Sequence, residues 1–402
     1  MWTRLLPAEP VLDVAALYAS WDAITVEQLH ASGGMKWTAF PVPIGAWVAE
    51  SDLGTAPAVT AAVLAAVEAG ITGYLPPAVS AAMGEATAVW MRSRFGWDVP
   101  AARVHPVADV ITGLDLAIDH YSRPGSAVVV PTPAYMPFLT VPGRHGRAAV
   151  EVPNAVRADG RETLDLVGVE AALVEGAGLV VLCNPLNPGG RVFEREELVA
   201  LSELVDRFDA RVFADEVHAP LVFAPHEHVP YASVSAASAA HSVTTTSASK
   251  AFNLPGLKAA QFITHSAADE VVWQAIGPLA SHGASTLGVI ANTAAYRSGG
   301  EWLAAQLAYL DRNRRLLGEL LAEHLPEVGY RMPEGTYIAW LDVSALDLGA
   351  DAALTLRERA GVALTDGAEC GAAGVGHVRL IMATPAPVLE QLVLRIRNAV
   401  RG

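Results

Sequence analysis

The stretch TSASKAFNLPGLK, residues 246–258, places Lys250 just past an apolar run, with serines before it and Lys258 eight residues later. An ordinary surface lysine needs no such setting. A lysine held at the end of a buried strand can lose its charge and act as a nucleophile or a base. The pattern therefore marks Lys250 as a candidate catalytic amine.

Other polar side chains follow apolar runs in the same way. The run 126–131 leads to Tyr135, 178–183 to Asn184, 210–215 to Asp215 and His218, and 242–247 to Lys250. Taken singly, each has an ordinary explanation as a turn residue, a cap or a snorkelling side chain. Parallel sheets, however, bind ligands beyond the carboxyl ends of their strands, so four such ends favour one shared site.

The elements that must position these residues form a doubly wound pattern. Between about residues 100 and 265, short Val-rich runs alternate with predicted helices at 164–176 and 194–208, which is typical of a mostly parallel sheet. After residue 290 the pattern changes to amphipathic helices, which enclose a short strand region at 336–344. We predict an N-terminal segment (1–60) that packs with the C-terminal unit, a large domain (61–290) and a small α+β domain (291–402).

Composition excludes several classes of protein. The chain has 402 residues, 52% of them apolar, and a net charge of −15, which disfavours binding to nucleic acid. We find no signal peptide, and the apolar runs are shorter than the roughly 20 residues of a membrane span. Two cysteines and no CxxC motif predict no metal site and favour a reducing, cytoplasmic setting.

A lysine, an aspartate, an asparagine, an aromatic ring and a phosphate-binding nest are the parts that hold pyridoxal phosphate. SASKAFNLPGLK, NPLNPGG and ADEVH resemble the fold-type I pyridoxal-phosphate enzymes, the aspartate aminotransferase superfamily. WVAESDLGTAP, GITGYLPP, ADEVHAPLVF, PEGTYIAWLDVSAL and VRLIMATP resemble its cystathionine β-lyase (carbon–sulfur lyase) branch, which includes the maltose-regulon modulator. The similarity runs from about residue 25 to 398. It implies a large domain with a mostly parallel seven-stranded sheet and a small domain built from both chain ends.

The resemblance assigns a role to each candidate residue of the cofactor site. Lys250 would hold the cofactor covalently, Asp215 would pair with the ring nitrogen, and Tyr135 would stack on the ring. Asn184, helped by His218, would donate to the ring's 3-oxygen. The phosphate-binding residues would be Ser247, Ser249, Lys258 and the backbone amides of Val110 and Ile111, which begin a helix capped by Asp109.

The resemblance also implies a substrate site. Arg379 would bind the substrate carboxylate through its planar fork, with Asn184 nearby and Trp47 at the entrance. Tyr74 would reach the phosphate and substrate of the neighbouring subunit, which implies a homodimer with shared active sites. Ile381 stands where the branch commonly has Asn, and Ser51 lies in a less typical stretch, so substrate preference is the property that these departures affect.

Three functions remain open on this pattern. The first is α,β-elimination of L-cystathionine or a related cysteine S-conjugate to a thiol, pyruvate and ammonia, with Lys250 taking the Cα proton. The second is an aminotransferase that uses the same Lys250, Asp215 and Arg379 with a 2-oxo acid acceptor. The third is a regulatory binding protein that retains the cofactor fold.

Overall fold

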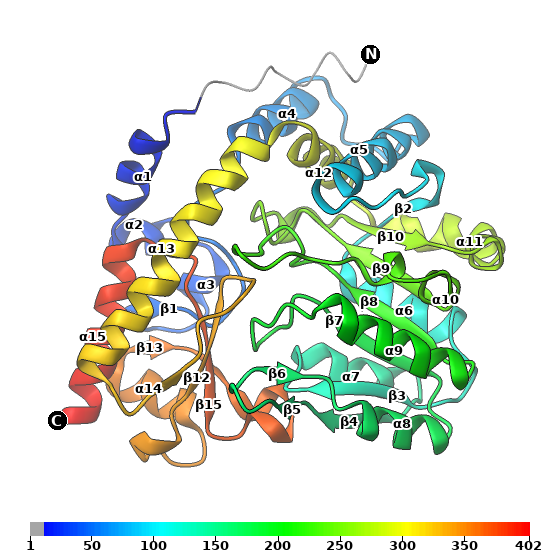
Figure 1. The fold of residues 1–402 in the computed structure, drawn as a ribbon. Helices are drawn as coiled ribbons and strands as arrows, with labels where there is room; N and C mark the ends of the chain where they lie inside the picture. Colours follow the sequence, from blue (N-terminus) through cyan, green and yellow to red (C-terminus); the bar gives the residue numbers. More distant parts are fainter. Residues whose placement is uncertain (1–11) are drawn as a thin grey trace.

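The computed structural model describes residues 12–402, and its centre is a seven-stranded sheet (Figure 1). In spatial order the strands are β2 (Val104–Val107), β10 (Ala260–Thr264), β9 (Ser242–Thr246), β8 (Arg211–Asp215), β7 (Leu179–Cys183), β3 (Val128–Thr132) and β4 (Ala149–Pro153). Only β10 runs antiparallel to its neighbours. The predicted mostly parallel, seven-stranded sheet is therefore confirmed.

The four predicted strands lie within two residues of the observed β3, β7, β8 and β9. Every residue of β3, β7 and β9 is buried, which explains why these strands are apolar or Thr-rich runs without a polar alternation. Cys183 of β7 pairs with Asp215 of β8, and Asp215 with Thr245 of β9. The carboxyl ends of these strands thus lie side by side.

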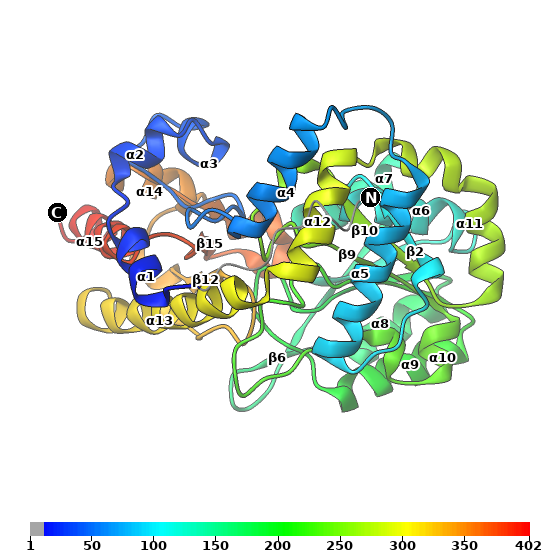
Figure 2. The ribbon, with the colours of Figure 1, turned by 90° about the horizontal axis from the view of Figure 1, so that it is seen from above.

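Helices cover both faces of this sheet. In Figure 2, α6 (Val110–His120) and α7 (Met136–Arg144) lie on one side, and α8 (Leu166–Val174), α9 (Arg195–Arg207) and α10 (Ala236–Ala240) on the other. A Cβ atom on Gly113 of α6 would lie 2.3 Å from Thr245 Oγ1. Glycine therefore lets the first turn of α6 approach the sheet closely.

A second sheet is built from the C-terminal part of the chain. Its order is β11 (Gly329–Tyr330), β12 (Ile338–Asp342), β15 (His377–Ile381) and β14 (Thr365–Asp366). The long helix α13 (Gly300–His324) and α15 (Ala386–Arg401) pack along it, as predicted for 301–325 and 386–400, while α14 (Ala352–Ala360) precedes β13 (Figure 1). Together these elements form a smaller α+β unit.

The N-terminal segment packs against this smaller unit. β1 (Ile44–Gly45) pairs with β13 (Val362–Ala363), and Tyr18 Oη of α1 (Val14–Asp22) donates to the Ala305 carbonyl of α13. Residues 1–11 of the predicted segment 1–60 lie outside the described residues. The domain boundaries at 60 and 290 stay predictions, and α4 (Pro57–Glu68) and α12 (Thr286–Ser298) run across them.

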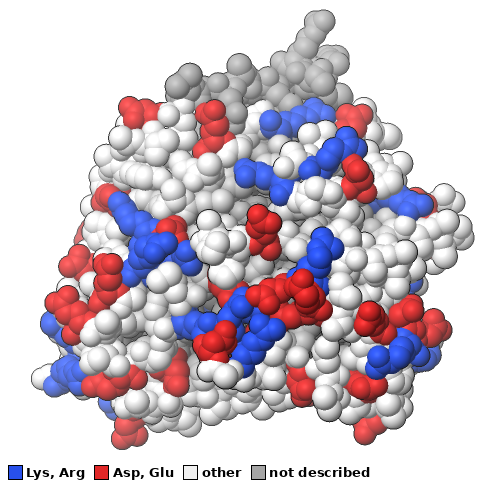
Figure 3. Space-filling model, in the orientation of Figure 1, with Lys and Arg blue, Asp and Glu red and all other residues white. Residues whose placement is uncertain are grey.

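On the face shown in Figure 3, acidic and basic side chains are interspersed and no broad basic patch forms. Within residues 12–402, no helix is both long and apolar enough to cross a membrane. The same residues contain no cluster of three or more His, Cys, Asp or Glu side chains suited to a metal ion.

Candidate active site

A cavity of about 330 Å³ lies at the carboxyl ends of the central strands. Most of the residues predicted from the sequence line it: Trp47, Val110, Ile111, Tyr135, Asp215, His218, Ser249, Lys250, Lys258 and Arg379. They come from the N-terminal segment, from loops after β3, β8 and β9, from the start of α6 and from β15. The fold thus gathers side chains from more than 300 positions of the chain into one site.

Lys250 lies inside this cavity and is not a solvated charge. Its Nζ donates to the Ala49 carbonyl at 3.1 Å, and Tyr337 Oη donates to the same oxygen at 3.0 Å. Burial, followed by the nearby charge of Arg379, lowers the pKa of Lys250 to about 8. With this pKa about a tenth of Lys250 is a neutral amine at pH 7, far more than for an ordinary lysine, and the neutral form is the one that a nucleophile requires.

Asp215 ends β8 with its side chain buried, at 4% exposure. Its Oδ1 accepts the Val217 N–H at 3.0 Å. Burial raises the pKa of Asp215 to about 7, while the Val217 N–H and the charge of Lys250 oppose this shift. A carboxyl group in this state is suited to a partner that brings a positive N–H into the cavity.

His218 is a neutral wall of the same cavity. Burial lowers its pKa to about 3, and the charges of Lys250 and Arg379 add to this effect. Its Nδ1 is buried without a hydrogen-bond partner, and its ring lies edge-on to Tyr337. An unpartnered buried nitrogen is suited to a polar ligand atom.

One end of the cavity is built to receive an anion. Val110 and Ile111 are the first two residues of α6, and their amides have no intrahelical acceptors. Asp109 caps this helix by accepting the Thr112 N–H, and it also pairs with Lys258 Nζ at 3.0 Å. A phosphate at this helix start would gain the helix dipole and an ammonium group.

The same cavity is also lined by Arg379, whose side chain is buried. Its guanidinium donates to Asn187 Oδ1 at 3.2 Å, to the Trp47 carbonyl at 3.0 Å and to Thr365 Oγ1 at 3.3 Å. Its Nε has no partner. The group is thus held in place by neutral acceptors, which leaves its positive charge uncompensated for a carboxylate.

The structure differs from the prediction for the asparagine. Asn184 does not line the cavity: its Oδ1 accepts the Phe193 N–H at 3.1 Å, and its Nδ2 is buried without a hydrogen-bond partner. Asn187, three residues later, lines the cavity and contacts Arg379. The motif NPLNPGG contains two Asn-Pro pairs. The second pair, which begins at Asn187, was the signal that the sequence reasoning missed.

Two other predicted residues do not line this cavity. Ser247 is 1% exposed, and its hydroxyl donates to the Ala259 carbonyl, although it also accepts the Ser249 N–H and so shapes the turn before Lys250. Tyr74 is 86% exposed beside His282 and lines a separate hollow.

Ile381 and Ser51, the two departures noted in the sequence, lie outside the cavity. Ile381 is fully buried outside the cavity, and its N–H donates to the Ala46 carbonyl beside Trp47. Ser51 exchanges two hydrogen bonds with Asn253. Ala49, Thr365 and Tyr337 also position the site, but a backbone carbonyl and buried hydroxyls give no recognisable sequence signal.

These residues fit pyridoxal phosphate. The cavity offers a depressed-pKa amine for an aldehyde, a buried acid for a ring nitrogen, an aromatic side chain in Tyr135 for a ring face, and a helix start with Lys258 for a phosphate. The unpartnered nitrogen of His218 adds a polar contact. The donor set therefore matches the cofactor group by group.

Comparison with known proteins agrees with this geometry. The family model "Aminotransferase class I and II" matches residues 47–396. The cystathionine beta-lyase of Corynebacterium glutamicum is 37% identical over 376 residues, which cover 93% of this chain and 98% of that protein.

Solved structures give the same result. A structure from Corynebacterium diphtheriae, named as a PLP-dependent beta-cystathionase, has a TM-score of 0.88 and 39% identity, covering 94% of this chain and 98% of that one. The PLP-bound C-S lyase of Staphylococcus hominis has a TM-score of 0.87 and 27% identity, with 94% and 98% coverage. The chain belongs to the aminotransferase class I and II family, on its cystathionine β-lyase branch.

Proposed function

We propose that this protein is a pyridoxal-phosphate-dependent carbon–sulfur β-lyase that converts L-cystathionine or a related cysteine S-conjugate, with water, to a thiol, pyruvate and ammonia. The observation that carries the proposal is the cavity itself, which brings Lys250 and Asp215 together with the helix start that suits an anion and with Arg379, which suits a carboxylate. The names of the relatives support the reaction class.

In this proposal the cofactor is held by residues of five segments. Lys250 would attach it, Asp215 would pair with its ring nitrogen, Tyr135 would cover the ring, and Asn187 would take the role first given to Asn184. The amides of Val110 and Ile111, with Ser249 and Lys258, would hold its phosphate, while Ser247 supports the turn and His218 would offer a further polar contact. When bound, the cofactor supplies an electron sink for the carbanion formed at the substrate's Cα.

The remaining steps belong to the protein's own groups. Arg379 binds the substrate carboxylate and thereby orients the Cα–H bond. Lys250 takes the Cα proton in its neutral form, which its lowered pKa makes more accessible than in an ordinary lysine. Loss of that proton allows the β-carbon–sulfur bond to break, and the sulfur leaves with the bonding electrons as a thiolate, which a proton then neutralises. When the amine of Lys250 is not bonded to the cofactor, it donates a hydrogen bond to the Ala49 carbonyl.

We also propose a homodimer and a cytoplasmic location. Tyr74 is an exposed aromatic side chain beside a hollow of about 730 Å³ formed with residues 281–287, which supports a subunit contact through which Tyr74 reaches the neighbouring site. Both cysteines, Cys183 and Cys370, are buried thiols, which supports a reducing compartment.

The test compares two reactions of the purified holoenzyme. L-Cystathionine alone should give pyruvate and free thiol in equal amounts, without any 2-oxo acid. Formation of glutamate only when 2-oxoglutarate is added would instead establish an aminotransferase, which needs the same Lys250, Asp215 and Arg379.

A further inference from the structure

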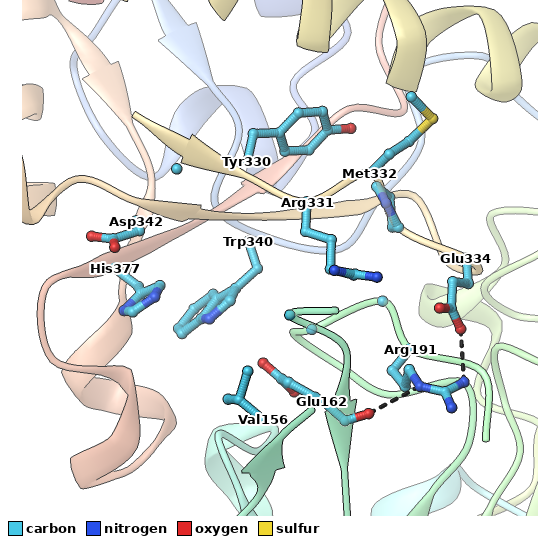
Figure 4. Close-up of a pocket in the computed structure, with 15 residues that line it drawn as sticks. Val156, Glu162, Arg191, Tyr330, Arg331, Met332, Glu334, Trp340, Asp342 and His377 are labelled. Atoms are coloured by element: carbon cyan, nitrogen blue, oxygen red, sulfur yellow. Dashed lines mark hydrogen bonds and ion pairs between the residues drawn. The ribbon is translucent and has the colours of Figure 1, made fainter. Parts of the chain in front are cut away.

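A second cavity, of about 400 Å³, lies between the two sheets and shares no lining residue with the Lys250 cavity (Figure 4). One side is formed by the hairpin of β5 (Ala155–Val156) and β6 (Glu162–Thr163) and by residues 189–191. The other side is formed by residues 329–334 and by side chains of β12 and β15. Its walls therefore come from both parts of the molecule.

One side of this cavity carries an uncompensated carboxylate. Glu162 Oε2 is buried and has no hydrogen-bond partner. Burial raises the pKa of Glu162, and the Asn154 amide and the charges of Arg191 and Arg331 oppose this shift. A Cβ atom on Gly189 would lie 2.7 Å from this oxygen, so glycine keeps the space beside it open. Among residues 12–402 no cationic side chain forms an ion pair with Glu162 within 4.0 Å, although Arg191 and Arg331 act on it from a longer distance.

The opposite side carries an uncompensated guanidinium. Arg331 is exposed and donates to the Asp159 carbonyl at 2.7 Å, but within residues 12–402 it has no carboxylate within 4.0 Å. Arg191 and Glu334, which also line the cavity, are in contrast paired with each other at 2.8 Å (Figure 4). Figure 4 shows the side chains of Arg331 and Glu162 on opposite sides of the cavity.

An apolar surface lies beside these two charges. The rings of Trp340 and His377 stack at 5.0 Å with an angle of 9°. Val156 and Met332 are 69% and 38% exposed at the rim. Asp342 adds a second carboxylate beside His377. A small molecule that carries a cation, an anion and an apolar group would use the Glu162, Arg331 and Trp340 surfaces together.

We propose that this cavity binds a neutral α-amino acid, with its ammonium group at Glu162, its carboxylate at Arg331 and its apolar side chain against Trp340. Because these residues come from both sides of the cavity, the ligand stabilises one arrangement of the large and small units. Binding at this second site does not depend on the reaction proposed at Lys250.

The experiment uses L-methionine and the holoenzyme. Isothermal titration counts the binding sites, while the visible absorbance of the cofactor reports occupation of the Lys250 cavity alone. We expect binding heat in the wild type that is not accompanied by an absorbance change. Glu162→Gln and Arg331→Gln should each weaken the L-methionine affinity of this second site, the one without an absorbance change, by at least tenfold.

The matched control is Arg157→Gln, on the same hairpin but outside the cavity, which should leave both components unchanged. Arg331 is exposed, so its substitution should not alter the thermal unfolding temperature. Binding heat that follows the cofactor absorbance throughout, and is the same in all three variants, would overturn the proposal. Failure of the lyase proposal would appear separately: no pyruvate would form from L-cystathionine, while the binding heat without an absorbance change would remain.

Discussion

Replacement of Arg379 tests how the protein recognises an amino-acid substrate. The guanidinium is 3% exposed and is oriented by Asn187, the Trp47 carbonyl and Thr365. A carboxylate held by two charge-assisted hydrogen bonds gains about 1.5–3 kcal/mol from each. Loss of both in Arg379→Ala removes about 3–6 kcal/mol, which corresponds to a decrease in kcat/KM of about 10²- to 10⁴-fold. Arg379→Lys keeps the positive charge but loses the two parallel N–H donors of the guanidinium, so we expect a decrease in kcat/KM of about 10- to 10²-fold.

Most of this loss should appear in KM, because the carboxylate is bound equally in the ground state and the transition state. The assay follows pyruvate from L-cystathionine over a range of substrate concentrations. Arg147→Lys is the matched control, since Arg147 is also buried but bonds to the Ser126 and Ile118 carbonyls away from the cavity. A kcat/KM for Arg379→Ala within fivefold of the wild type would refute the assignment.

Five further substitutions, in three experiments, separate catalytic from structural roles. Asn187→Ala should lower kcat/KM by about tenfold or more in steady-state kinetics. Asn184→Ala should instead lower the free energy of unfolding by about 1–3 kcal/mol in urea unfolding, because it removes the acceptor of the buried Phe193 N–H. Equal kinetic losses in the two variants would contradict this distinction. Asp215→Asn should stabilise the cofactor-free protein at pH 8 by up to about 4 kcal/mol. The unfolded chain releases the Asp215 proton near pH 4 and the folded chain near pH 7, so the free energy of unfolding of the wild type falls as pH rises between these values. Urea unfolding at pH 8 and at pH 4 measures the gain, which should vanish at pH 4; an equal gain at both pH values would refute the titration of Asp215 as its cause. Gly113→Ala should cost about 1–3 kcal/mol by thermal unfolding through its clash with Thr245, and Thr245→Ala should relieve that cost.

Sequence patterns predicted the sheet well because buried parallel strands are short, continuous apolar runs. The runs before Lys250 and Asp215 end at the strand ends that the structure places side by side. The alternation of strands and helices then limits the fold to few topologies. The same rule brought Lys250, Asp215 and Tyr135 to one edge without any knowledge of side-chain geometry.

Details of the loops could not be predicted in this way. Asn184 and Asn187 occupy equivalent places in a repeated Asn-Pro pair, and only the path of the chain decides which one faces the cavity. Lys250 and Arg379 each donate to a backbone carbonyl, that of Ala49 and that of Trp47, which every residue possesses. Such contacts depend on tertiary packing and leave no mark on residue type.

The measurement that bears most directly on the proposed chemistry compares the wild type with Lys250→Ala. Both are assayed with L-cystathionine and no 2-oxo acid, and the visible absorbance of the bound cofactor is recorded for each. We predict equal amounts of pyruvate and thiol from the wild type, and from Lys250→Ala neither product above background, with the visible absorbance band lost or shifted. A Lys250→Ala variant that forms pyruvate at the wild-type rate would contradict the assignment of Lys250 as the catalytic amine.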